Sequence, residues 1–173
     1  MSERIVTFFG TGNAKPGDDA YRLAYETGKI LAQAGFAIAN GGYGGTMTAA
    51  AKAAAEVGGE SIGVTCSAYC AKANKYISRE ITTDSLQQRL ATLIELGLGY
   101  VILPGGTGTL LELAMVWELQ NKGFLDHGKP IILVGEFWMP VAKVIWAAQP
   151  RSKKYIKPVV QPEKVRELLM SIV

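Results

Sequence analysis

Glycine gathers in three short stretches of the sequence, in a pattern that suits the binding of a phosphate group. The stretches are Gly10-Thr11-Gly12, Gly41-Gly42-Tyr43-Gly44-Gly45 and Pro104-Gly105-Gly106-Thr107-Gly108-Thr109. Glycine lets the backbone approach a ligand closely, and it allows a tight turn into a helix whose free N–H groups attract a phosphate. We therefore expect phosphate or nucleotide contacts from Gly10, Thr11, Gly41, Gly42, Gly44, Gly45, Gly105, Gly106, Thr107, Gly108 and Thr109.

These stretches differ from two common nucleotide-binding motifs. Lys15 stands where the dinucleotide fingerprint has its third glycine, and Ala39-Asn40 lacks the acidic residue that would hold the ribose of NAD. The lysine of P-loop NTPases is also missing from all three stretches. The sequence thus disfavours dinucleotide dehydrogenases and P-loop NTPases. Glycines that only turn strands into helices would explain one stretch better than three converging ones.

Glu112 is a candidate catalytic carboxylate. The spacing Thr109-x-x-Glu112 also matches a capping box, and spacing alone does not choose between the two roles. On a helical wheel Glu112 lies among Met115, Val116 and Leu119. A carboxylate that faces apolar surroundings needs a partner or a function, which favours the catalytic role.

Arg89 has a plain structural interpretation, which its neighbours in the sequence favour on their own. It lies beside Leu86 and Leu93, where a surface arginine could lay its stem along the margin of an apolar helix face. Tyr43 could stack on a base or only pack, and His127 is expected in a loop.

Short apolar runs alternate with helical patterns along the chain, and they define the elements that would position these residues. Strands are expected over 5–9, 36–39, 61–65, 100–103 and 130–134, with an extended piece near 159. Helices are expected over 18–34, 45–57, 84–96, 109–122, 138–148 and from 162 onward, and residues 66–82 are expected to form an irregular loop.

This alternation predicts βαβ units and a parallel sheet, and the strands are apolar throughout, as in sheets covered on both faces. We expect an α/β protein, a Rossmann-like three-layer sandwich with a mostly parallel sheet, in a single domain over residues 1–173. All three glycine stretches then fall at the carboxyl edge of the sheet, where such sheets bind ligands.

The composition limits the classes of partner. The 173 residues are 49% hydrophobic, which argues against disorder, and the net charge of +3 is too small and too evenly spread to suggest nucleic acid. Cys66, Cys70 and the single histidine do not complete a usual zinc site, so no metal or cofactor is expected. Free thiols, no recognisable secretory signal and glycine interruptions in the longest uncharged stretch predict a cytoplasmic protein without a membrane partner.

The third glycine stretch carries the most specific motif. Residues 104–112 resemble the PGGxGTxxE motif of the LONELY GUY (LOG) family, whose characterised members are cytokinin riboside 5'-monophosphate phosphoribohydrolases. Residues 40–47 resemble that family's GGGxxGLM loop, Gln88-Arg89 takes the place of its ERK segment, and 127–130 resemble its HxKP stretch. The resemblance extends over nearly the whole chain.

The resemblance implies hydrolysis of the N-glycosidic bond of a nucleoside 5'-monophosphate, of the AMP or cytokinin riboside monophosphate type. The products would be a free base and ribose 5-phosphate, through a transition state like an oxocarbenium ion. By its place in the motif, Glu112 would stabilise that charge and orient the attacking water, and Arg89 would orient the substrate. Gly105, Gly106, Gly108 and Thr109 would hold the phosphate.

The chain departs from the family pattern next to these residues. Leu90 replaces a lysine, Leu111 a glutamate, and Thr48 and Asn40 replace glycines. These changes leave the preferred base open. They also leave open a non-catalytic binder of a nucleotide or a phosphate-bearing cofactor, similar to the molybdenum cofactor carrier proteins, in which Glu112 would be dispensable. A nucleotide sensor acting through residues 66–82 has no support beyond that loop.

The helix expected over 109–122 is apolar on nearly every side. A small domain offers little depth in which to bury such a helix, so the sequence predicts a homodimer. The resemblance implies the same, because the LOG family forms dimers with the active site at the subunit boundary.

Overall fold

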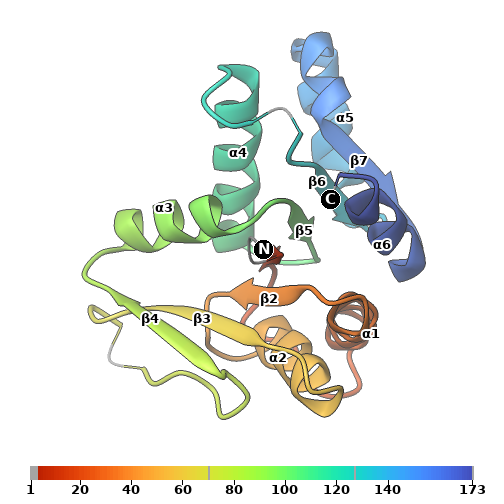
Figure 1. The fold of residues 1–173 in the computed structure, drawn as a ribbon. Coiled ribbons are helices and arrows are strands. Elements are labelled where there is room, and N and C mark those ends of the chain that lie inside the picture. The colour runs from red at the N-terminus through yellow and green to blue at the C-terminus, as the bar shows by residue number, and fades with distance from the viewer. Residues whose placement is uncertain (1–3, 70, 127, 173) are drawn as a thin grey trace.

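Seven parallel strands form the central sheet in the part of the chain that the structure, a computed structural model, describes: residues 4–69, 71–126 and 128–172 (Figure 1). The strands are β1 (Ile5–Phe9), β2 (Ala37–Asn40), β3 (Ser61–Cys66), β4 (Arg79–Thr83), β5 (Tyr100–Ile102), β6 (Ile131–Val134) and β7 (Ile156–Val159). Their order is β4-β3-β2-β1-β5-β6-β7, and each neighbouring pair is parallel. The order reverses between β1 and β5, and ligands of such sheets bind where the order reverses.

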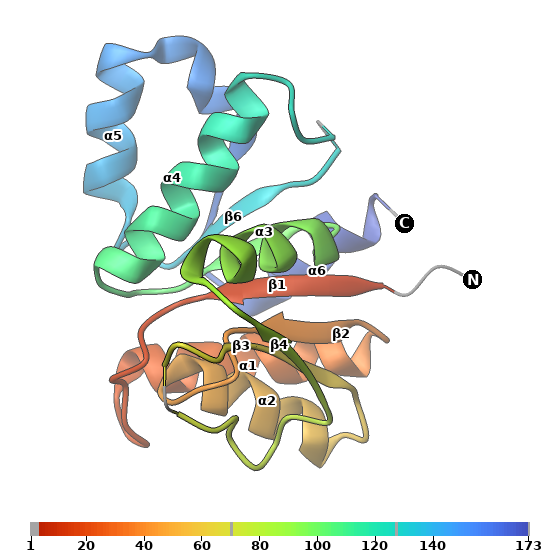
Figure 2. The ribbon, with the colours of Figure 1, turned by 90° about the vertical axis from the view of Figure 1, so that its left-hand side faces the viewer.

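Helices cover both faces of the sheet (Figure 2). They are α1 (Asp19–Gln33), α2 (Thr46–Glu56), α3 (Leu86–Leu96), α4 (Thr107–Asn121), α5 (Met139–Ala148) and α6 (Pro162–Met170), with a 3₁₀-helix η1 (Pro150–Tyr155). Side chains of α1, α2 and α6 share one core, and those of α3, α4 and α5 share another. The expected α/β three-layer sandwich is confirmed.

The apolar strands contribute side chains to both cores, because successive side chains of a strand point to opposite faces of the sheet. Around β5, Tyr100 and Ile102 belong to the core of α3, α4 and α5, whereas Val101 and Leu103 belong to the other core. This placement explains why the strand is apolar at every position rather than at alternate ones.

Strand β4 corrects the sequence prediction, because all of it except Thr83 lies in residues 66–82, which were expected to form an irregular loop. It pairs in parallel with β3, from Ile62 opposite Arg79 to Cys66 opposite Thr83. As one of the two edge strands of the sheet it is largely exposed, and its sequence Arg-Glu-Ile-Thr-Thr is mostly polar. Polar and charged side chains are common on edge strands because they discourage pairing with other chains, and they remove the apolar run that identifies a strand.

None of the helices in the described residues is long and apolar enough to span a membrane.

Candidate functional site

The three glycine stretches meet where the strand order reverses, and Thr11 joins them. Its backbone N–H donates to the carbonyl of Pro104 at 3.1 Å. Its own carbonyl accepts from the backbone N–H of Thr46 at 2.9 Å and from the Thr46 hydroxyl at 3.0 Å. The loop after β1 is therefore held between the loops that precede α2 and α4.

A cavity of about 290 Å³ lies among these loops. Its walls include the predicted residues Gly10, Thr11, Arg89, Gly106, Thr107, Gly108, Thr109 and Glu112. Sequence reasoning missed Gly12, Asn13 and Met47, which line it as well. Gly12 lies in the first glycine stretch, and Met47 lies in the loop 40–47 that resembles a family motif. Those two motifs are the sequence signals from which both residues could have been predicted.

The N-terminus of α4 forms one wall of the cavity. Gly106 is its N-cap, without a side-chain cap, and open space surrounds the positions where Gly106 and Gly108 would carry a Cβ. The first N–H groups of a helix have no acceptor within it, and the helix dipole makes them attractive to an anion. This end of α4 is suited to a phosphate group.

The capping-box interpretation of Thr109 and Glu112 is wrong. Because α4 begins at Thr107, Thr109 is already the third helical residue and Glu112 lies in the second turn. Glu112 therefore cannot close the helix N-terminus.

Five other predicted glycines do not line the cavity, and a Cβ on any of them would lie within 3.0 Å of another residue: Gly41, Gly42, Gly44, Gly45 and Gly105. Gly45 has φ +64°, and a Cβ there would lie 2.2 Å from the Thr11 carbonyl oxygen. A Cβ on Gly41 would lie 1.7 Å from Nη2 of Arg89. These two glycines permit close packing of the loops and of the arginine.

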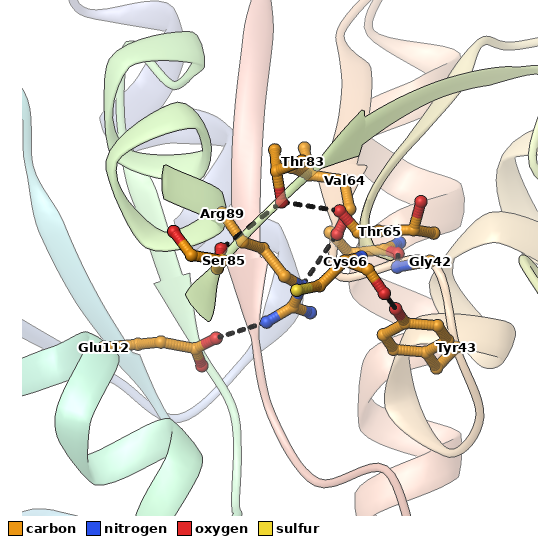
Figure 3. Close-up of polar contacts among 10 residues, drawn as sticks. Gly42, Tyr43, Val64, Thr65, Cys66, Thr83, Ser85, Arg89 and Glu112 are labelled. Carbon is orange, nitrogen blue, oxygen red and sulfur yellow. Dashed lines mark hydrogen bonds and ion pairs between the residues drawn. The ribbon is translucent and has the colours of Figure 1, made fainter. Parts of the chain in front are cut away.

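Arg89 and Glu112 face each other across the cavity, from α3 and α4 (Figure 3). The Arg89 side chain is only 9% exposed, so the surface-arginine alternative is wrong. Its Nε donates to the carbonyl of Val64 at 2.8 Å, and its Nη1 lies 4.0 Å from Oε1 of Glu112. The guanidinium also lies 5.5 Å from the centre of the Tyr43 ring.

Glu112 has a carboxyl group that titrates near neutral pH. Its side chain is 15% exposed, and burial raises its pKa to about 7, while the positive charge of Arg89 acts in the opposite direction. A carboxyl group with such a pKa exchanges protons readily at physiological pH, a property typical of catalytic acids and bases.

Cys70 and His127 lie outside the described residues. Among residues 4–69, 71–126 and 128–172, no group of three His, Cys, Asp or Glu side chains could hold a metal ion.

The chain was compared with models of known protein families. Residues 3–166 match the model of the SLOG cluster4 family. The chain belongs to this family. The predicted LOG-like resemblance is thereby confirmed.

Two relatives named cytokinin riboside 5'-monophosphate phosphoribohydrolase are similar in sequence. The one from Mycobacterium tuberculosis is 34% identical over 65% of this chain and 60% of its own length. The one from Rhodococcoides fascians is 30% identical over 82% of this chain and 74% of its own length. The matched region thus spans less than two thirds of the mycobacterial protein.

A solved structure, that of the molybdenum cofactor binding protein from Rippkaea orientalis, has the same fold. It superimposes with a TM-score of 0.84 and 24% identity, over 99% of this chain and 98% of the other.

Proposed function

We propose that the protein hydrolyses the N-glycosidic bond of a nucleoside 5'-monophosphate, of the AMP or cytokinin riboside monophosphate type. Water adds across the C1'–N bond, its hydroxyl going to C1' and a proton to the released base. The observation that carries this proposal is the buried pair of Glu112 and Arg89, which lies in one cavity with the N-terminus of α4. The names of the two sequence relatives support the same activity.

The first step is binding of the 5'-phosphate. The N–H groups of Thr107, Gly108 and Thr109 begin α4 and would surround it, aided by the helix dipole. Gly106 and Gly108 leave room for the phosphate oxygens because no Cβ occupies that space. Phosphate binding there fixes one end of the substrate against a rigid helix, which reduces the entropy that the reaction must lose.

The second step is cleavage beside Glu112. Positive charge develops on C1' and the ring oxygen as the bond to the base lengthens, and an ionised carboxylate in a poorly hydrated site stabilises it. The same carboxylate can orient the attacking water and accept its proton. Arg89 favours the ionised form of Glu112 and can orient the sugar or the leaving base.

The test is to incubate the protein with a panel of nucleoside 5'-monophosphates, including AMP and isopentenyl-AMP, and to measure the released free base by chromatography. Wild-type protein should release base, and both Glu112→Gln and Arg89→Ala should lose the activity. Glu118→Gln is a matched control on the same helix, because Glu118 is half exposed and pairs with Lys122. Base release that persists in Glu112→Gln would remove Glu112 from the mechanism.

A second candidate function is binding of a nucleotide or phosphate-bearing cofactor without turnover. The structural similarity to the Rippkaea orientalis protein and the departures from the family pattern beside Glu112 favour it. A binder of this kind would leave AMP intact and would bind its ligand equally well in wild type and Glu112→Gln, as measured by calorimetry.

We also propose that the protein is cytosolic, because a free thiol such as that of Cys66 persists in that compartment. We further propose that it acts as a homodimer. Leu110, Leu111 and Met115 of α4 are exposed by 40%, 45% and 41%. Leu110 also borders a mostly apolar groove between α4 and α5. An exposed apolar surface on the helix that carries Glu112 is suited to a second copy of the chain.

A further inference from the structure

Tyr43 contacts Arg89 without lining the cavity. The centre of its ring lies 5.5 Å from the guanidinium, within the range of a cation–π interaction. The residues that line the cavity do not include Tyr43. In this arrangement the ring is placed to hold the arginine rather than to stack on a bound base.

The ring of Tyr43 is itself fixed by hydrogen bonds to β3. Its hydroxyl accepts from the backbone N–H of Cys66 at 2.9 Å and donates to the carbonyl of the same residue at 3.4 Å (Figure 3). The ring of Tyr69 packs against it, with 6.0 Å between the ring centres.

The backbone of Tyr43 is held as firmly as its ring. Its carbonyl accepts from the side-chain amide of Asn74 at 2.8 Å and from the hydroxyl of Thr48 at 2.9 Å. Asn74 also donates to the carbonyl of Gly42 from its backbone N–H and its side chain. The loop between β2 and α2 is therefore anchored from two directions, and it presents the Tyr43 ring at a fixed place.

The guanidinium of Arg89 has few other positions available. Val64 holds Nε, Gly41 leaves space for Nη2, and the Tyr43 ring lies beside the group. The ring and the bare face of Gly41 come from the same loop. Together they direct Nη1 toward Glu112, the charged side chain that faces Arg89 from α4.

We propose that Tyr43 is a positioning residue, whose ring holds the guanidinium of Arg89 in place beside Glu112. The role in catalysis rests on the proposed function, but the role in positioning does not. In the free protein Tyr43 keeps the positive charge near the carboxyl group, and in the reaction it keeps Arg89 aligned with the substrate.

The first experiment is a pH titration of Glu112 by NMR in protein labelled with ¹³C at glutamate carboxyl groups. The Glu112 signal is identified by its absence in Glu112→Gln. The wild-type group should titrate near pH 7, as its environment predicts. Because Arg89 lowers the pKa of Glu112, displacement of the guanidinium raises it, and Tyr43→Leu should shift the titration upward by roughly half a unit to one unit.

Two further variants separate the ring of Tyr43 from its hydroxyl and from its neighbours. Tyr43→Phe keeps the ring and loses only the bonds to Cys66, so it should fold and should shift the titration in the same direction by less. Tyr69→Leu removes the exposed neighbouring ring and should leave the Glu112 titration unchanged. An equal shift in Tyr69→Leu, or no shift in any folded Tyr43 variant, would overturn the proposal.

Gly41→Ala tests the same geometry from the other side. The backbone of Gly41 does not adopt a positive φ, so alanine adds no backbone strain there. Its Cβ would lie 1.7 Å from Nη2 of Arg89 and 2.8 Å from Sδ of Met47, so the guanidinium and the thioether must move away. It should therefore reproduce the upward shift of Tyr43→Leu. An unchanged titration in folded Gly41→Ala would contradict the inferred packing of Arg89.

Base release gives a second readout that distinguishes positioning from base stacking. If Tyr43 positions Arg89, Tyr43→Leu lowers kcat and moves the rising limb of the pH profile upward, with less change in KM. If Tyr43 stacks on the base, KM rises by a factor that depends on the base, and the titration of free Glu112 stays unchanged. Absence of base release by wild-type protein would refute the proposed function alone, because the NMR titration still decides the role of Tyr43.

Discussion

Helices α2 and α4 both begin after a glycine stretch at the same edge of the sheet, yet their N-termini differ in what packs against them. The N-cap of α2 is Gly45, and the loop after β1 lies directly on it, with Thr11 accepting from the backbone N–H of Thr46. The N-cap of α4 is Gly106, and open space surrounds it at the cavity. The same sequence signal thus produces a packed helix end in one case and a candidate anion site in the other.

The difference between the two ends follows from the shape of the loops rather than from residue type. At α2, glycine allows two backbones to come close together. At α4, glycine leaves a volume that a ligand can fill. Substitutions at equivalent glycines should therefore affect stability at α2 and binding at α4.

The largest expected effect is on stability, from Gly45→Ala. Alanine is strained at φ +64°, and its Cβ would lie 2.2 Å from the Thr11 carbonyl oxygen, which belongs to the backbone and cannot easily move. We expect the free energy of unfolding to fall by roughly 3 to 4 kcal/mol, measured by urea denaturation. The comparison variant Gly108→Ala lies inside the first turn of α4, with open space around the added Cβ and no positive φ, so it should raise stability by about 0.5–1 kcal/mol. Equal losses in both variants would show that the two helix ends are packed alike.

The next effect is on binding, from Gly108→Asp at the start of α4. An added carboxylate there should repel a bound phosphate by about 3 kcal/mol and weaken AMP binding by roughly 100-fold in calorimetry. The fold should survive, because an acidic residue in the first turn of a helix is stabilising. Gly108→Asn, of equal size without the charge, fills the same space and should weaken binding by a smaller factor, so the difference between the two variants gives the electrostatic part of the loss. If Gly108→Asp binds AMP with wild-type affinity, the phosphate does not bind at the N-terminus of α4.

A third effect concerns the cost of keeping Glu112 in this cavity. Because burial raises its folded pKa from 4.5 to about 7, the folded state favours the protonated form, and stability is lost progressively as pH rises from the lower of these values through the higher one. Glu112→Gln removes this cost and should be more stable than wild type by about 2 kcal/mol above pH 7.5. The difference should shrink as pH falls below 7 and vanish below about pH 3.5, where folded and unfolded Glu112 are both protonated. Thermal unfolding across pH measures it, and a constant difference would indicate that ionisation of Glu112 is not the cause.

Sequence patterns predicted the elements that lead to the two helix ends, but not which of the two ends borders the cavity. The strands before them, β2 and β5, were both expected, as was the turn from each strand into its helix. Edge strand β4 was missed because its polar side chains carry no apolar period. Which glycines line the cavity could not be predicted, because that depends on how the loop after β1 crosses α2 rather than on any residue type.

The pairing of Glu112 with Arg89 was also beyond sequence patterns alone. Arg89 sits at the margin of an apolar helix face, and its burial depends on the Val64 carbonyl and on the space that Gly41 leaves. The family motif supplied both residues as candidates. The position of Tyr43 beside them required the folded loop.

The smallest expected effect concerns the outer surfaces of the two helices, which differ as much as their ends. Buried alanines of α2 pack in a core shared with α1, whereas Leu111 on α4 is 45% exposed. If a second copy covers this surface, Leu111→Lys should place a charge in the interface and weaken dimerisation by roughly 10-fold, measured by sedimentation over a range of concentrations. Lys52 of α2 is partly exposed on the opposite face of the sheet, and Lys52→Ala is the control that should leave the equilibrium unchanged. A wild-type protein that is monomeric at every concentration would show that α4 tolerates its exposed leucines, and it would refute the proposed homodimer.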